Sequence, residues 1–430
     1  MAKLDYIGSV VDMVFRALLV LLSIALFGLA QEYAPDVALD HPAIKYFENP
    51  VNDVVSKLAK DVESGKVSLE HRGGLSWLPS VLQRLGINLD SQALVFSRTS
   101  VQAAKVAPNH PRAIYFADNV AVAFVPGSDE IELAATDPRQ GVVFYSLNIK
   151  PAEKPAFVRG TICVKCHQGP ATSGVPGMFV GSVFPNALGN PAKEGAIITD
   201  HRTKFEDRWG GWYVNAKRGQ QKDRANAVAS NPAEPTELDT EGQQNLTTLI
   251  GKFNPEGYLT PISDMISLMT FEHQTQMTNF ITRVGWQARI TQQEGKTDEF
   301  SQAKLEAEID ALVTYMLFID EEPLPAPVEG VSTFTKTFPQ RGPRDHLGRS
   351  LRDFDLQKRL FRFPLSYMVY SESFDALPGS VRERIYQRLY DILTGKDTTP
   401  KFAKIAQADR QAIIEILRET KPALPAYWRR

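Results

Sequence analysis

Cys163-Val164-Lys165-Cys166-His167 is the stretch around which this chain of 430 residues is organised. Two thiols stand two residues apart, and an imidazole follows the second thiol directly. The chain has only 2 cysteines, both in this stretch, so none remains for a structural disulfide elsewhere. Thiols at this spacing can bond to the two vinyl groups on one edge of a porphyrin, and the adjacent histidine can then ligate the metal.

The five residues resemble the haem-attachment site of a c-type cytochrome. The resemblance implies that Cys163 and Cys166 carry one covalent haem c and that His167 is the proximal ligand of its iron. Three other interpretations of the same residues stay open. A redox-active dithiol needs no histidine and follows a strand of a βαβ unit. A zinc site needs further ligands, and a disulfide across two spacers is strained.

The first 30 residues are typical of a secretory signal. Residues 17–30 form an almost wholly apolar run that follows Arg16 and ends in Gly-Leu-Ala, where a signal peptidase needs small residues. An uncleaved membrane anchor is the alternative, but it would bury Asp12 and Arg16 in the bilayer at a high cost. Both interpretations predict an exported, periplasmic protein that touches the membrane only through this segment, if it stays uncleaved. This location agrees with the resemblance, because haem c is attached outside the cytoplasmic membrane.

The composition indicates a globular protein without a strongly charged partner. Hydrophobic residues make up 43% of the chain, which is enough for sizeable cores, and the formal net charge is −2. A charge balance this close to zero favours neither nucleic acid nor a membrane surface as a partner. About 400 residues follow the N-terminal segment, enough for two or three domains.

The hydrophobic pattern predicts an α+β fold with a mainly helical haem unit. Between residues 93 and 147, short apolar runs and turn residues such as Asp118-Asn119 predict a small N-terminal antiparallel sheet. Long helices are expected over 262–290 and 305–317, where apolar residues recur at the helical period. We therefore expect a signal peptide or anchor, an α+β domain, a cytochrome c-like haem unit and a helical C-terminal unit, over residues 1–30, 31–157, 158–325 and 326–430 respectively.

Two segments after the motif hold further candidate pocket residues. Residues 168–191 are rich in glycine and proline and include Met178 among several apolar residues, which suits contact with a porphyrin face or with an ordinary core. Residues 209–213 read Trp-Gly-Gly-Trp-Tyr, and His201 lies shortly before them. Large amphipathic rings line ligand pockets and also pack around tight turns, so both interpretations are kept.

A second axial ligand for the iron is expected among the histidines and methionines. His273 lies on the apolar face of the helix expected over 262–290, one turn from Met269 and one turn from Met277. A rigid helix that presents a single nitrogen among apolar neighbours favours His273 as the distal ligand. His201 is the second choice and a pocket residue. The full set of candidates is Met178, His201, His273, Met277 and Met368.

The function implied by the resemblance is electron transfer by a mono-haem cytochrome that exchanges electrons with a redox partner protein. One-haem cytochrome c domains are far smaller than this chain, so a haem enzyme of peroxidase or oxidase type, or a sensor of a small ligand, is kept as the alternative. An enzyme needs an open iron position and a group that moves protons. Enzymes similar to bacterial cytochrome c peroxidases usually carry two haem motifs, whereas this chain has one.

Overall fold

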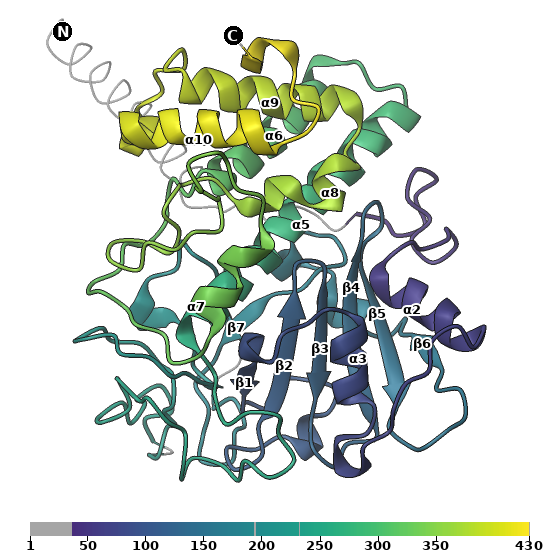
Figure 1. Ribbon diagram of the computed structural model, residues 1–430, viewed down its shortest axis with the longest axis vertical. Helices are drawn as coiled ribbons and strands as arrows, with labels where there is room; N and C mark the ends of the chain where they lie inside the picture. Colours follow the sequence, from purple (N-terminus) through teal and green to yellow (C-terminus); the bar gives the residue numbers. More distant parts are fainter. Residues whose placement is uncertain (1–36, 193–194, 232, 430) are drawn as a thin grey trace, which may run out of the picture.

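The computed structural model describes residues 37–192, 195–231 and 233–429, so the expected export segment lies outside the described residues. The centre of the fold is a seven-stranded antiparallel sheet in the order β6-β5-β4-β3-β2-β1-β9 (Figure 1). Its strands are β1 Ala93–Val95, β2 Arg112–Ala117, β3 Val120–Phe124, β4 Glu130–Asp137, β5 Gly141–Asn148, β6 Phe157–Arg159 and β9 Trp212–Tyr213. A separate two-stranded ribbon pairs β7 Val180–Ser182 with β8 Ile197–Thr199.

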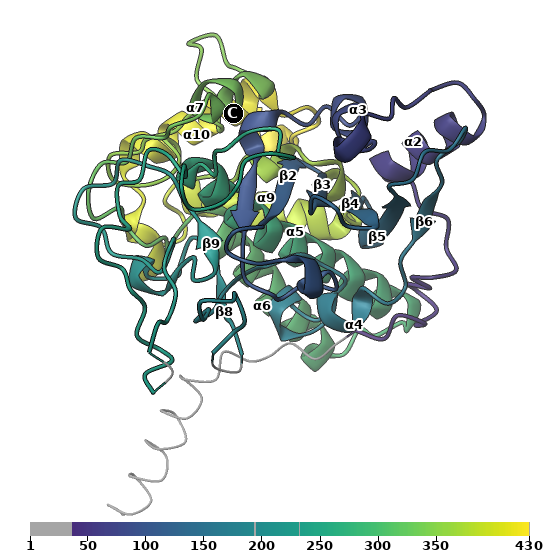
Figure 2. The same ribbon diagram turned by 90° about the horizontal axis from the view of Figure 1, so that it is seen from below.

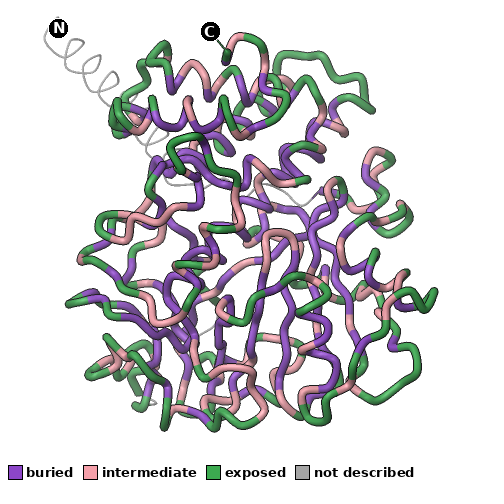
Figure 3. The backbone as a smooth tube through the Cα atoms, viewed as in Figure 1, coloured by how far each residue is buried: buried purple, intermediate pink, exposed green. Residues whose placement is uncertain are grey.

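Both faces of the seven-stranded sheet are buried, because side chains alternate along each strand between two apolar layers. In β2, Tyr115 belongs to the layer shared with α2 and α3, whereas Phe116 belongs to the layer shared with α5. The helices that cover the two faces are α2 Val54–Glu63 and α3 Leu78–Arg84 on one side and α5 Met265–Gln293 on the other (Figure 2). The buried parts of the tube view follow the strands and α5 through the middle of the molecule (Figure 3).

The predicted fold class is wrong in its proportions. We expected a mainly helical unit over 158–325 beside a small N-terminal sheet, but the sheet is the centre of the structure, and its edge strand β9 comes from within 158–325. Before α5, the only α-helix described in that range is the single turn α4 Val164–His167. The physical reason is the frequent glycine and proline, which break helical hydrogen bonding and leave loops and short strands. The boundaries of the four expected units stay predictions.

Several local predictions are confirmed. The Asp118-Asn119 turn joins β2 to β3, with Ala117 paired to Val120. The two long helices are present as α5 and as α6 Glu299–Met316, and both begin after an aspartate whose side chain accepts a backbone hydrogen bond. Helix α5 runs along the sheet and packs against α6, so it lies at the centre of the molecule.

The C-terminal helices extend the core that α5 and α6 begin. α9 Gly379–Leu393 packs against both α6 and α10 Gln407–Thr420 (Figure 1). The short helices α7 Phe334–Thr337 and α8 Glu372–Asp375 contact α5. One apolar cluster therefore continues from the sheet through α5 and α6 into these helices. In the described part of the chain, no helix has the length and apolar character needed to cross a membrane.

Candidate functional site

The cysteine motif lies on one helical turn beside the edge of the sheet. α4 Val164–His167 follows the edge strand β6 after a short connection (Figure 2). Within this connection, Gly160 donates its N–H to the carbonyl of Phe144 in β5 at 2.8 Å, so the chain is tied to the sheet immediately before the motif.

The orientation of this helical turn is set by Val164. Its side chain is buried in an apolar cluster with Tyr46 and Trp286. With Val164 turned inward, Cys163 is only partly buried and Cys166 is exposed. Both thiols are free, so the structure has no disulfide across the two spacers.

The imidazole of His167 is held through one nitrogen and leaves the other free. Its Nδ1 lies 3.0 Å from the carbonyl oxygen of Gly177, and because a carbonyl only accepts, Nδ1 carries the proton. Nε2 then has a lone pair and makes no hydrogen bond within the described residues. Burial lowers the pKa of His167, which favours the neutral ring. A histidine that ligates a metal is held in the same way, through its other nitrogen.

Apolar side chains lie beside the His167 ring and precede the motif in the chain. The rings of Phe144 and Phe179 lie 4.8 and 5.5 Å from the His167 ring, centroid to centroid. Val158 and Ile162, on the N-terminal side of the motif, are 59% and 57% exposed. A flat apolar porphyrin would cover such groups and remove them from water. The residues present therefore fit a haem attached through the two thiols and ligated by His167.

The loop that positions His167 is supported from α5. A Cβ on Gly177 would lie 2.0 Å from Oδ1 of Asn279, so only glycine fits at this position. Asn279 donates from Nδ2 to the carbonyl of Met178 at 2.8 Å, and Gly177 donates its N–H back to the carbonyl of His167 at 2.9 Å. Sequence reasoning did not find this support, because it joins residues 101 apart in the chain.

The surroundings of Cys163 disfavour its thiolate form. Partial burial raises the pKa of Cys163, and the negative charge of Glu132 raises it further. Redox-active pairs instead lower a thiol pKa so that the thiolate forms. Cys163 does stand at the N-terminus of α4, but this helix is a single turn, and burial has the largest effect on the thiol pKa. As for a zinc site, no group of three or more His, Cys, Asp or Glu side chains suited to a metal occurs in residues 37–192, 195–231 and 233–429.

His201 and His273 form a buried pair. Their Nδ1 atoms lie 2.9 Å apart, and both rings stack with Tyr315. Burial lowers the pKa of each ring well below its usual value, so the pair is neutral at physiological pH. The structure thus brings together the first and second choices for the distal ligand, but it gives neither of them a contact with His167.

The candidates for the distal ligand are all packed inside the protein. His273 uses both ring nitrogens, since its Nε2 lies 2.8 Å from Oγ of Ser366. Met178, Met277 and Met368 are buried. The axial roles of His273 and His201 therefore stay predictions, and each would require these packed contacts to rearrange.

A buried carboxylate next to the histidine pair was missed by sequence reasoning. Glu272 in α5 is 0% exposed and accepts hydrogen bonds from the hydroxyl of Thr199 at 2.6 Å and from Nε1 of Trp209 at 2.9 Å. Nη1 of Arg208 lies 3.5 Å from its other oxygen, and Nη2 of Arg208 donates to the carbonyl of His201. Burial raises the pKa of Glu272 to about 7. This network shows that Trp209 packs in the core. The contact between Trp209 and Glu272 joins residues 63 apart in the chain, so no local sequence pattern indicated it.

The comparisons with known proteins add no assignment to these observations. No family model matches the chain, and no significant match was found among curated proteins or solved structures.

Proposed function

We propose that this protein is an exported mono-haem c-type cytochrome that transfers electrons to or from a redox partner protein. Cys163 and Cys166 would hold the haem covalently, and His167 would ligate its iron through Nε2. The observation that carries the proposal is the hydrogen bond from Nδ1 of His167 to the carbonyl of Gly177, which leaves Nε2 free beside two thiols. Export is part of the proposal, because haem c is attached outside the cytoplasmic membrane.

The protein would supply attachment, orientation and access. The Gly177 carbonyl orients the imidazole and increases its basicity, as outer partners of ligating histidines do. When bound, the haem iron would supply one-electron chemistry between its ferrous and ferric states. Cys166 is exposed, and Val158 and Ile162 are more than half exposed, so a partner protein could approach the attachment edge directly.

A haem protein that binds a small ligand, as an enzyme or a sensor, is the second candidate. The observation that favours it is the state of the distal candidates: His273 has both nitrogens occupied, and Met178, Met277 and Met368 are buried. If these contacts persist in the holoprotein, none of the four supplies a second strong ligand. The fifth candidate, His201, keeps an unpartnered Nε2, but this atom lies beside a separate cavity, so the iron would then accept an external ligand.

Optical and EPR spectra of the holoprotein, with and without carbon monoxide, separate the two candidates. A low-spin haem that does not react with carbon monoxide supports the electron carrier, whereas a high-spin haem that binds it supports the second candidate. In both cases His167→Ala should change the spin state, because it removes the axial nitrogen. His346→Ala is the matched control, since His346 is exposed and pairs only with Glu419. An unchanged spectrum in the His167 variant would refute the ligand assignment.

A further inference from the structure

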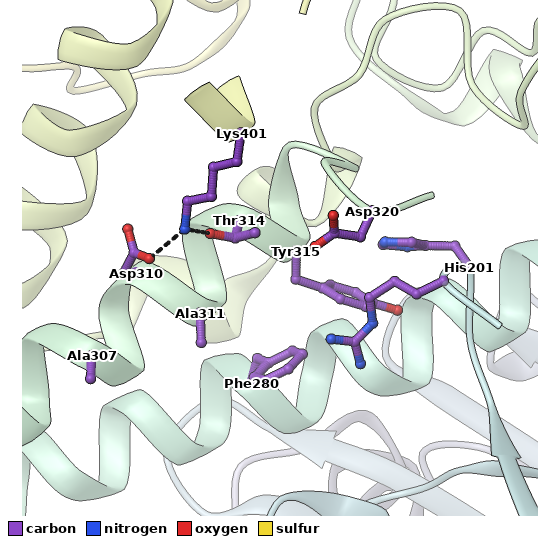
Figure 4. A pocket seen from close by; sticks show the side chains of 10 residues that line it. His201, Phe280, Ala307, Asp310, Ala311, Thr314, Tyr315, Asp320 and Lys401 are labelled. Carbon is purple, nitrogen blue, oxygen red and sulfur yellow. Dashed lines mark hydrogen bonds and ion pairs between the residues drawn. The ribbon is translucent and has the colours of Figure 1, made fainter. Parts of the chain in front are cut away.

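A cavity of about 270 Å³ opens beside the histidine pair, on a different side of α5 from the motif loop. Asn279 binds the motif loop, whereas the next residue, Phe280, lines the cavity. The other lining residues come from the segment after β8, from α6 and the turn that follows it, and from residue 401: His201, Arg202, Ala307, Asp310, Ala311, Thr314, Tyr315, Asp320 and Lys401 (Figure 4).

His201 brings an unpartnered nitrogen to this cavity. The residue is 3% exposed, and its Nε2 is buried without any hydrogen-bond partner. The ring is fixed by stacking on Tyr315 at 4.1 Å and by its Nδ1 contact with His273. Figure 4 shows the His201 side chain directed into the space near Asp320 and Tyr315. A buried polar atom left unpaired is costly, so it points to a group that binds there.

The hydrogen-bond chain behind His201 decides that this nitrogen is a donor. Oγ of Ser366 accepts from the N–H of Met368, and among the described residues its own proton has one hydrogen-bond acceptor, Nε2 of His273 at 2.8 Å. The proton of His273 therefore lies on Nδ1, which donates to Nδ1 of His201. The remaining proton of His201 lies on Nε2. The reverse arrangement would leave the buried hydroxyl of Ser366 without an acceptor.

The other polar groups around the cavity also leave more donors than acceptors open. Arg202 donates from Nε and Nη2 to Asp200, and its Nη1 makes no hydrogen bond within the residues that the structure describes. Lys401 uses two of its three N–H groups, on Asp310 and Thr314. Each carboxylate that lines the cavity has a cation from outside the lining as a partner: Arg388 donates to Asp310, and Lys404 pairs with Asp320 at 3.6 Å. The open hydrogen-bonding capacity therefore calls for an acceptor-rich ligand.

The size and walls of the cavity limit that ligand further. At about 30 Å³ for each water, the volume holds roughly nine waters, or a molecule of about that many non-hydrogen atoms. Phe280 and Tyr315 supply aromatic surface, and Ala307 and Ala311 supply small apolar surface at the exposed side of α6. We propose that this cavity binds a small monocarboxylate, whose oxygens accept hydrogen bonds from Nε2 of His201 and from Arg202 while its apolar body lies against Phe280.

Titration of the holoprotein with benzoate tests this site, with benzamide as the uncharged probe of the same shape. Benzoate should bind saturably in calorimetry and raise the melting temperature with its concentration, and benzamide should bind at least tenfold more weakly. The haem spectrum recorded alongside should not change, which separates this site from the iron. If benzoate changed the haem spectrum and calorimetry showed no binding apart from that to the iron, the proposal would be overturned.

Variants locate the bound molecule. Ala311→Leu should weaken benzoate binding at least tenfold by filling the cavity from α6, whereas Ala303→Leu, also exposed on α6 but outside the cavity, should leave it unchanged. His201→Phe keeps a ring on Tyr315 but removes the donor, and it should abolish the preference for benzoate over benzamide. If the His201 variant fails to fold, the comparison of Ala311→Leu with Ala303→Leu still tests the location of the site. Equal binding by the Ala311 and Ala303 variants would refute the site.

Discussion

Replacing Gly210 by alanine is expected to destabilise the protein by about 3 kcal/mol or more, the upper range for inserting a group into a packed region. A Cβ at this position would lie 1.9 Å from the carbonyl oxygen of Val183 and 3.0 Å from its carbonyl carbon. The two backbone segments are already in close contact here, because Val183 donates its N–H to the carbonyl of Gly210 and Gly210 donates its N–H to Oγ of Ser182. The backbone segments around Val183 and Gly210 would have to move apart, and the hydrogen bonds that join the end of β7 to the start of β9 would be lost.

Urea unfolding of the holoprotein measures this effect as a lower midpoint. Gly379→Ala is the control, because Gly379 is exposed at the start of α9 and an added Cβ meets nothing within 4 Å. The control should be neutral or stabilising by about 0.4–1 kcal/mol, since alanine restricts the unfolded chain. A Gly210 variant as stable as this control would contradict the packing described for the Trp-Gly-Gly-Trp segment.

Replacing Glu272 by alanine should cost about 3–5 kcal/mol, the usual penalty for breaking a buried ion pair from one side. The variant leaves the guanidinium of Arg208 without its carboxylate, and the donors of Thr199 and Trp209 without their acceptor. Glu306→Ala provides the comparison, because Glu306 pairs with Arg384 at an exposed site on α6. That pair should contribute at most about 1 kcal/mol. Similar midpoints of urea unfolding for the two variants would show that the Glu272 network does not hold the fold.

Glu272→Gln adds a pH signature to the same test. Burial raises the pKa of Glu272 from 4.5 to about 7, so the folded state holds this proton more tightly than the unfolded state does. The stabilisation from protonated Glu272 is complete below pH 4.5 and is lost as the pH rises through about 7. The glutamine variant cannot ionise, so its stability relative to the wild type should rise over this interval. If the difference in unfolding free energy between the glutamine variant and the wild type did not change with pH, Glu272 would not be buried as described.

The sequence was most informative where the structure depends on neighbouring residues. The Asp118-Asn119 turn and the helical period of α5 act over short separations, and both were predicted. The motif is local as well, because the two thiols and His167 lie within one helical turn. The size of the sheet relative to the helical part could not be predicted from such local patterns. The strand β9 has only two residues, and its place beside β1 depends on a partner more than a hundred residues earlier.

The candidate site shows the same division. The free Nε2 of His167 depends on Gly177, which lies in a loop held by Asn279 of α5. The pairing of His201 with His273 spans 72 residues, and no local pattern indicates it. The apolar face of α5 correctly placed His273 inside the protein. It could not indicate that Ser366 and His201 would occupy both nitrogens of the ring.

The intact mass of the denatured protein tests the central claim most directly, after production in cells that carry a cytochrome c maturation system. The account predicts that the wild-type chain retains the mass of one haem after acidified-solvent extraction. It also predicts that the Cys163→Ala/Cys166→Ala double variant retains none, while keeping the fold that Val164 anchors. A wild-type chain that matures without covalent haem, or a double variant that still holds it, would contradict the account.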